Sequence, residues 1–98
     1  MEEKNSEKSD TNIVFIGGKP LVNYVRGVLH QFKTANAAEV IIKSRGKFIS
    51  KAVDVAEIAR RTLAEDGVSL KEVKISSESF ETEGRVTNIS TMDIILGK

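Results

Sequence analysis

The feature that most constrains the fold is the order of segments in the first half of the chain. Residues 12–16 (NIVFI) are apolar and end at Gly17 and Gly18, which is typical of a buried strand followed by a tight turn. Pro20 then predicts a helix start, because the N–H that proline lacks would be unpaired at the first helical position. Residues 40–42 predict a second strand. A strand, a helix and a strand in this order predict a parallel pair joined by a right-handed crossover.

Two helices with an apolar face are predicted. The first carries apolar residues at helical spacing: Leu21, Val22, Val25, Val28, Leu29 and Phe32. The second runs from about Phe48 to Glu65 and ends at the Asp66-Gly67 pair. Within it, Val53 and Ile58 fall outside the apolar arc, on opposite flanks. A second buried surface, most simply a subunit contact, would explain this excess; a single exposed Ile58 without a role is the alternative, and the sequence leaves both open.

The last third of the chain predicts two strands joined by a polar loop. Residues 70–80 and 89–96 are rich in β-prone apolar residues, and residues 81–85 (ETEGR) separate them. Because these runs are long for so small a domain, we expect a hairpin arm that projects from the body. The predicted fold is α/β (α+β), in the order β-α-β-α-β-β, with two helices packed on a small mixed four-stranded sheet. Residues 12–98 form the predicted domain, and residues 1–11 a flexible polar tail.

Composition excludes several kinds of chemistry. The 98 residues contain no cysteine and a single histidine, His30, so the sequence predicts no thiolate chemistry, no metal site and no cofactor. The first ten residues are polar and no apolar run reaches the roughly 20 residues of a membrane span, so we expect a cytoplasmic protein without a membrane partner. The Gly17-Gly18-Lys19 loop is not a Walker motif, because Pro20 follows the lysine. A small enzyme that binds a phosphorylated substrate at this loop stays a rival hypothesis, but we predict that the protein is not an enzyme.

Charge is distributed unevenly along the chain. The formal net charge is only +1, yet residues 11–53 carry a net charge of +6, against −2 for residues 1–10 and −3 for residues 54–98. The basic residues between the predicted second strand and the second helix are Lys43, Arg45, Lys47 and Lys51. Turns that follow parallel strands lie at the same edge of a sheet, so Lys19 in the first loop should meet this cluster. One surface rich in cations predicts contacts with phosphates; a solvated basic face is the alternative, as in a purely structural oligomerisation module.

Two segments then resemble a known family. The stretches NIVFIGGKPLVNYV and IIKSRGKFISKAVDVAEIARR are similar to the archaeal Alba chromatin proteins, and the similarity extends over residues 12–96. The resemblance implies a β-α-β-α-β-β fold and a homodimer, possibly replaced by a heterodimer with a paralogue. It also implies binding of double-stranded DNA and of RNA without marked sequence preference, for chromosome packaging and DNA condensation. An RNA-binding subunit or RNA chaperone of a ribonucleoprotein particle is the alternative function.

The resemblance also assigns residues. It implies that Lys19, Lys43, Arg45 and Lys47 contact nucleic acid, and the basic cluster adds Lys51. It places Arg85 on a hairpin arm that reaches along a groove. Lys19 becomes the candidate for modification by acetylation.

Two positions depart from the family pattern. Many members have two lysines before the proline, whereas Gly18 occupies the first of these positions. Leu63 stands where some relatives carry a phenylalanine that joins one dimer to another, which predicts a weaker tendency to coat DNA as a filament. Ile58 and Leu63 are the candidate oligomer contacts.

Overall fold

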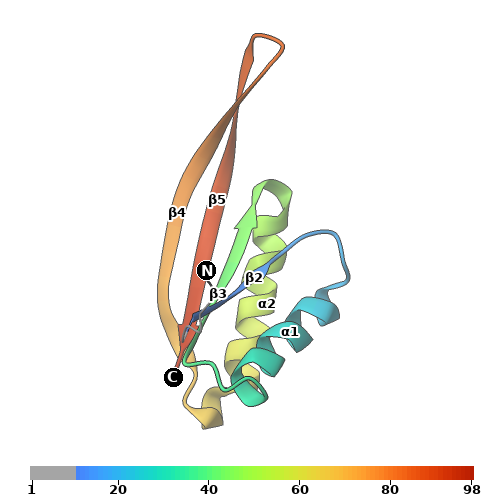
Figure 1. The fold of residues 1–98 in the computed structure, drawn as a ribbon. Helices are drawn as coiled ribbons and strands as arrows, with labels where there is room; N and C mark the ends of the chain where they lie inside the picture. Colours follow the sequence, from blue (N-terminus) through green and yellow to red (C-terminus); the bar gives the residue numbers. More distant parts are fainter. Residues whose placement is uncertain (1–10) are drawn as a thin grey trace, which may run out of the picture.

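A parallel strand pair joined by a helix opens the fold. The computed structural model describes residues 11–98, in which β2 (Thr11–Phe15), α1 (Leu21–Lys33) and β3 (Glu39–Arg45) follow one another. Strands β2 and β3 pair in parallel, with Val14 opposite Ile42. The predicted strand-helix-strand unit is therefore confirmed (Figure 1).

A long antiparallel hairpin completes the sheet. Strands β4 (Ser69–Thr82) and β5 (Arg85–Gly97) pair along their whole length, and β5 also pairs with β3, so the strand order is β2-β3-β5-β4. The outer half of the hairpin extends beyond the helices as an arm (Figure 1). Only Glu83 and Gly84 lie between the two strands, and both have positive φ angles, 51° and 78°, as a tight two-residue hairpin turn requires. The predicted arm is present, but its loop is shorter than the expected residues 81–85.

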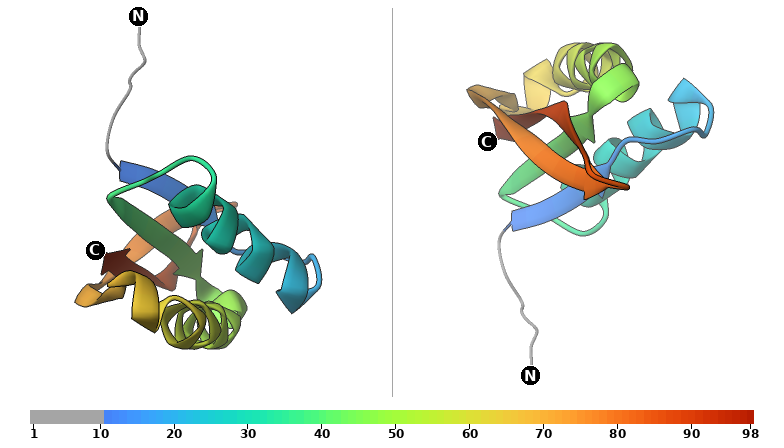
Figure 2. Two further views of the ribbon diagram at one scale, coloured as in Figure 1. Left: turned by 90° about the horizontal axis from the view of Figure 1, so that it is seen from below. Right: turned by 90° about the horizontal axis from the view of Figure 1, so that it is seen from above.

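Helix α2 (Ile49–Thr62) packs beside α1 on one face of the sheet (Figure 2). Short 3-10 turns flank it, at Gly46–Phe48 before it and at Ala64–Asp66 after it. Gly67 ends this segment with a φ of 87°, a left-handed conformation that glycine adopts without steric cost. The predicted helix over residues 48–65 is therefore one regular helix with a tighter turn at each end.

The predicted start of the first helix is displaced by one residue. Pro20 caps α1 with a ψ of 147°, so it is extended and the helix begins at Leu21. The ring of Pro20 still holds φ near the helical value, at −57°, and so prepares the chain for the helix that follows. None of the helices within residues 11–98 combines the length and the apolar character that crossing a membrane requires.

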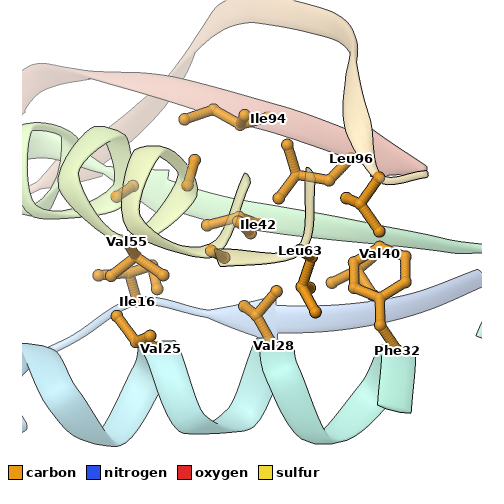
Figure 3. Close-up of a cluster of buried hydrophobic side chains, with 14 of the residues drawn as sticks. Ile16, Val25, Val28, Phe32, Val40, Ile42, Val55, Leu63, Ile94 and Leu96 are labelled. Carbon is orange, nitrogen blue, oxygen red and sulfur yellow. The ribbon is translucent and has the colours of Figure 1, made fainter. Parts of the chain in front are cut away.

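The hydrophobic core lies between the helices and the covered face of the sheet. Val25, Val28 and Phe32 project from α1 toward the strands (Figure 3). The largest fully buried side chains are Phe32, Ile42, Leu63, Leu96, Val28, Val40 and Val55. Along β3 the buried residues alternate with less buried ones, because successive side chains of a strand point to opposite faces.

Two predictions about particular positions need correction or limitation. Leu63, a candidate oligomer contact, is fully buried in the core of its own subunit and has no surface left for a second copy. Its position directly after α2 turns the side chain toward the sheet, near Phe32 and Val40 (Figure 3). The predicted polar tail over residues 1–11 lies outside the described residues except for Thr11, which belongs to β2.

The burial of Leu63 predicts a large effect of truncation. Leu63→Ala should lower the free energy of unfolding by about 2–5 kcal/mol, because a cavity remains in a closely packed core. Urea unfolding followed by circular dichroism measures this change. The matched control is Val22→Ala on the exposed side of α1, which should change stability by less than about 0.5 kcal/mol. Equal effects of the two substitutions would contradict the core position of Leu63.

Candidate nucleic-acid interface

The loop between β2 and α1 is held by the hydroxyl group of Tyr24. This oxygen accepts hydrogen bonds from the backbone N–H of Gly17, at 3.0 Å, and of Lys19, at 3.1 Å. A Cβ atom at position 17 would lie 3.3 Å from the hydroxyl oxygen, so glycine permits this close approach. Tyr24 thereby sets the path of the loop, a role that the sequence analysis did not assign to it. The separation of seven residues between Gly17 and Tyr24 carries no recognised motif that would have revealed it.

Lys51 joins this loop to the start of α2. Its ammonium group donates hydrogen bonds to the carbonyl oxygens of Gly17 and Lys19, both at 2.8 Å. The same Nζ atom lies 5.7 Å from the ring centre of Tyr24 and 5.6 Å from that of Phe48, within cation-π range. The loop after β2 and the segment after β3 therefore meet, as the parallel crossover predicts. Because its donors are used within the protein, Lys51 acts first as a brace of the loop and adds positive charge to the surface.

Lys43 and Arg45 lie in strand β3 rather than in a loop. The expected turn over residues 43–47 is therefore wrong in its first half, because the pairing of β3 with β5 continues through Arg45. Only Gly46 and Lys47 leave the strand, and Gly46 adopts a φ of 56° where the chain turns into the 3-10 segment. The two strand cations point to the sheet face opposite the buried residues Ile42 and Ser44.

Both strand cations have acidic partners on the hairpin. Lys43 Nζ lies 3.0 Å from an oxygen of Asp93, its cross-strand neighbour. Arg45 donates a hydrogen bond of 2.7 Å to Glu78, and its guanidinium group lies 5.5 Å from the ring centre of Phe80. Such surface ion pairs contribute at most about 1 kcal/mol each, so a phosphate can replace the carboxylate at low cost. The sequence analysis treated Glu78 as part of a solvated face, because no local pattern links residues 33 positions apart.

Lys19, Lys47 and Arg85 have no ion pair within residues 11–98. Lys47 Nζ lies 5.4 Å from the ring centre of Phe48, the ring that Lys51 approaches, so Lys47, Lys51 and the Lys19 loop form one continuous cationic surface. We call Lys19, Lys43, Arg45, Lys47 and Lys51 the loop-end cluster.

Arg85 lies apart from the loop-end cluster. It is the first residue of β5, paired with Thr82 at the tip of the arm. Glu78, the partner of Arg45, is four residues from Thr82 on β4, which is about 13 Å along a strand. The arm therefore carries a cation at a distance from the body, as the sequence analysis expected (Figure 1).

An exposed apolar groove lies on the other flank of α2, away from Ile58. It has a volume of about 190 Å³ and is lined mainly by apolar residues: Val53, Ala56, Leu70, Val73, Met92, Ile94 and Leu96. Glu57 and Arg60 also line it, and the hydrogen bond from Arg60 lowers the pKa of the Glu57 carboxyl while it raises the pKa of Arg60. Val53 was predicted to lie outside the core-facing arc, whereas the contribution of β4 to this surface was not predicted. Ile58 is 41% exposed, and its role as an oligomer contact stays a prediction.

The fold and the loop-end cluster define a class of small proteins with two helices on a mixed sheet, a cationic end and a projecting β-hairpin. A family model described as Alba matches residues 12–77. The chain is 51% identical over 87 residues to "DNA/RNA-binding protein Alba 1" of Archaeoglobus fulgidus, covering 89% of this chain and 96% of that protein. It is 46% identical to "DNA/RNA-binding protein Alba" of Methanothrix thermoacetophila, covering 92% of this chain and 99% of that protein.

A solved structure agrees with these sequence matches. The structure described as Alba from Thermoplasma volcanium superposes with a TM-score of 0.78 at 45% sequence identity, covering 89% of this chain and all of that one. The chain belongs to the Alba family, and the resemblance noted in the sequence is confirmed.

The hydroxyl group of Tyr24 can be tested directly. Tyr24→Phe removes the acceptor of two backbone hydrogen bonds and keeps the ring, at an expected cost of about 0.5–1.5 kcal/mol per bond. Amide hydrogen exchange at Gly17 and Lys19 should become faster, while exchange at Val28, in the middle of α1, stays slow. Unchanged exchange at both loop amides would show that the hydroxyl group does not hold the loop.

Proposed function

We propose that this protein binds nucleic acid through its phosphates, without sequence preference, and packages the chromosome in the cytoplasm. The observation that carries the proposal is the continuous cationic surface formed where Lys51 ties the Lys19 loop to the segment holding Lys47. Phosphate contacts require cations on one surface, and this surface unites two segments that are distant in sequence. The relatives named DNA/RNA-binding protein Alba support the same function.

The cations divide by what they must give up to contact a phosphate. Lys19 and Lys47 have no ion pair within residues 11–98 and would bind first. Lys43 and Arg45 would exchange Asp93 and Glu78 for a phosphate, so the net gain from each is smaller. Lys51 would contribute its charge while it keeps the loop in place. Contacts of this kind carry no sequence information, because they involve no base edge.

The arm would extend the contact beyond the body. A two-stranded ribbon is narrow enough to lie along a groove of duplex DNA, and Arg85 would place its guanidinium group there. Lys19 remains the candidate for acetylation, which would remove one of the two cations without an ion pair.

We further propose that the working unit is a homodimer, or a heterodimer with a paralogue, closed through the apolar groove beside Val53. Leu70 and Val73 of β4 are about half exposed there, next to the apolar flank of α2. A second copy would bury this surface and would place two loop-end clusters on one assembly. The alternative function, an RNA-binding subunit or chaperone of a ribonucleoprotein particle, would use the same phosphate contacts.

The salt dependence of binding tests the phosphate contacts. The logarithm of the affinity for duplex DNA should fall linearly with the logarithm of the salt concentration, and the slope should become less steep by about 0.9 in Lys47→Ala, because one phosphate contact is lost. Fluorescence anisotropy at several salt concentrations measures both quantities. Parallel titrations with RNA separate packaging of DNA from the ribonucleoprotein alternative, which predicts a clear preference for RNA.

A matched control for this experiment is Lys33→Ala. Lys33 lies at the far end of α1 from the Lys19 loop, so its removal should leave the slope unchanged. Affinity of the natural protein that does not respond to salt would contradict the proposed function. Equal slopes for Lys47→Ala and the natural protein would remove Lys47 from the contact surface.

The proposed dimer predicts a change of mass on substitution in the groove. Val73→Asp would place a charge in the apolar contact and should convert a dimer to a monomer in sedimentation velocity. Val86→Asp on the exposed arm is the control and should leave the dimer intact. A natural protein that sediments as a monomer would contradict the proposal, as would a dimer that persists in Val73→Asp.

A further inference from the structure

The ring of Phe15 is exposed on the face of the sheet that the helices leave open. Val14 packs against the core, so its neighbours Ile13 and Phe15 on β2 point to the opposite face. Phe15 is 71% exposed, against 46% for Ile13. The sequence analysis assigned this aromatic residue to a strand that is buried, because the run NIVFI contains no alternation of polar and apolar residues. An exposed ring on an edge strand has little effect on the core and is free to contact a ligand.

Phe15 also lines a large groove at the cationic end of the sheet. The groove has a volume of about 770 Å³, within the range of roughly 300–1,000 Å³ that is typical of sites for small ligands. It lies between the end of β2, the end of β3, the 3-10 turn and the base of the arm. The charged residues that line it with Phe15 are Lys43, Arg45, Lys47, Glu78 and Asp93.

The charges in this groove suit a nucleotide. Both carboxylates are paired, Asp93 with Lys43 and Glu78 with Arg45, so Lys47 contributes a cation that no carboxylate of the groove neutralises. The paired carboxylates can still accept hydrogen bonds from the amino groups on the edge of a base. An exposed ring, a cation and acceptors at one place match the aromatic face, the phosphate and the amino groups of a nucleotide.

We propose that this groove binds one unpaired base of single-stranded nucleic acid, stacked on Phe15 with its phosphate near Lys47. The inference rests on the proposed binding of phosphates and adds a second mode to it. A base inside a duplex is paired and stacked on both sides, and extruding it costs a few kcal/mol, so this groove selects single strands. Duplex binding uses the cations of the same end without the ring. Phe15 is thus the residue that separates the two kinds of ligand.

Substitution of Phe15 tests this site. Phe15→Leu should weaken binding of a short single-stranded oligonucleotide by about 5- to 100-fold and leave duplex binding unchanged, because loss of stacking removes a contribution that only an unpaired base makes. The slope of affinity against salt should stay the same, since no phosphate contact is lost. A 2-aminopurine base in the oligonucleotide should lose fluorescence on binding the natural protein, as stacked 2-aminopurine does, and should lose less on binding Phe15→Leu.

Two further variants make the result specific. Phe15→Tyr keeps an aromatic ring and should restore both affinity and quenching. Ile13→Leu alters an exposed apolar residue on the same face of β2 that does not line the groove, and it should have no effect. Thermal unfolding of each variant shows that the fold is retained, which the exposure of both positions leads us to expect.

The outcomes separate this inference from the proposed function. Salt-dependent binding of both ligands that is unaffected by Phe15→Leu would overturn the stacking site and leave the proposed function intact. An equal loss for duplex and single strand would also overturn it, because the ring would then serve the whole surface. Failure of the natural protein to bind either ligand would overturn both.

Discussion

Burial of the apolar faces of both helices against one side of β3 is the constraint on which the molecule depends. Val28 and Phe32 of α1 and Val55 of α2 meet Val40 and Ile42 of the strand with no exposed surface. Each fully buried side chain of this size contributes about 1.5–3 kcal/mol, so the cluster holds the helices on that face. With the helices placed there, the ends of β2 and β3 lie together and the opposite face of the sheet remains open.

The cationic end is a consequence of this arrangement, stabilised by local polar contacts. The ammonium group of Lys51 reaches across to two carbonyl oxygens, and the hydroxyl group of Tyr24 takes two N–H groups of the same loop. Lys51 thus uses its charge for structure, while Lys19 and Lys47 keep theirs for a ligand. The pairing of Lys43 with Asp93 and of Arg45 with Glu78 moderates the surface further. A cluster of five basic residues therefore acts as two accessible charges with three more that are engaged within the protein.

Much of the fold could be predicted because its signals are local. Glycines after an apolar run, a proline before an amphipathic helix and long β-prone runs each act within a few residues, and they led to the correct order of elements. Predictions that depended on distance were less successful. Leu63 was expected at an oligomer contact, but the path of the chain after α2 turns it into the core. The second basic segment was expected to be a loop, but pairing with β5, some 50 residues later, extends the strand through Arg45.

The sequence by itself determined the family, the order of helices and strands, and the concentration of positive charge in residues 11–53, because composition and periodicity are properties of the chain alone. Only the tertiary structure decided which cations have partners and which apolar residues are exposed. Asp93 becomes the neighbour of Lys43 through the register of β3 and β5, and Phe15 becomes exposed because no helix covers its side of the sheet. Both outcomes depend on which segments pack together in space, and local patterns of residues do not contain that information.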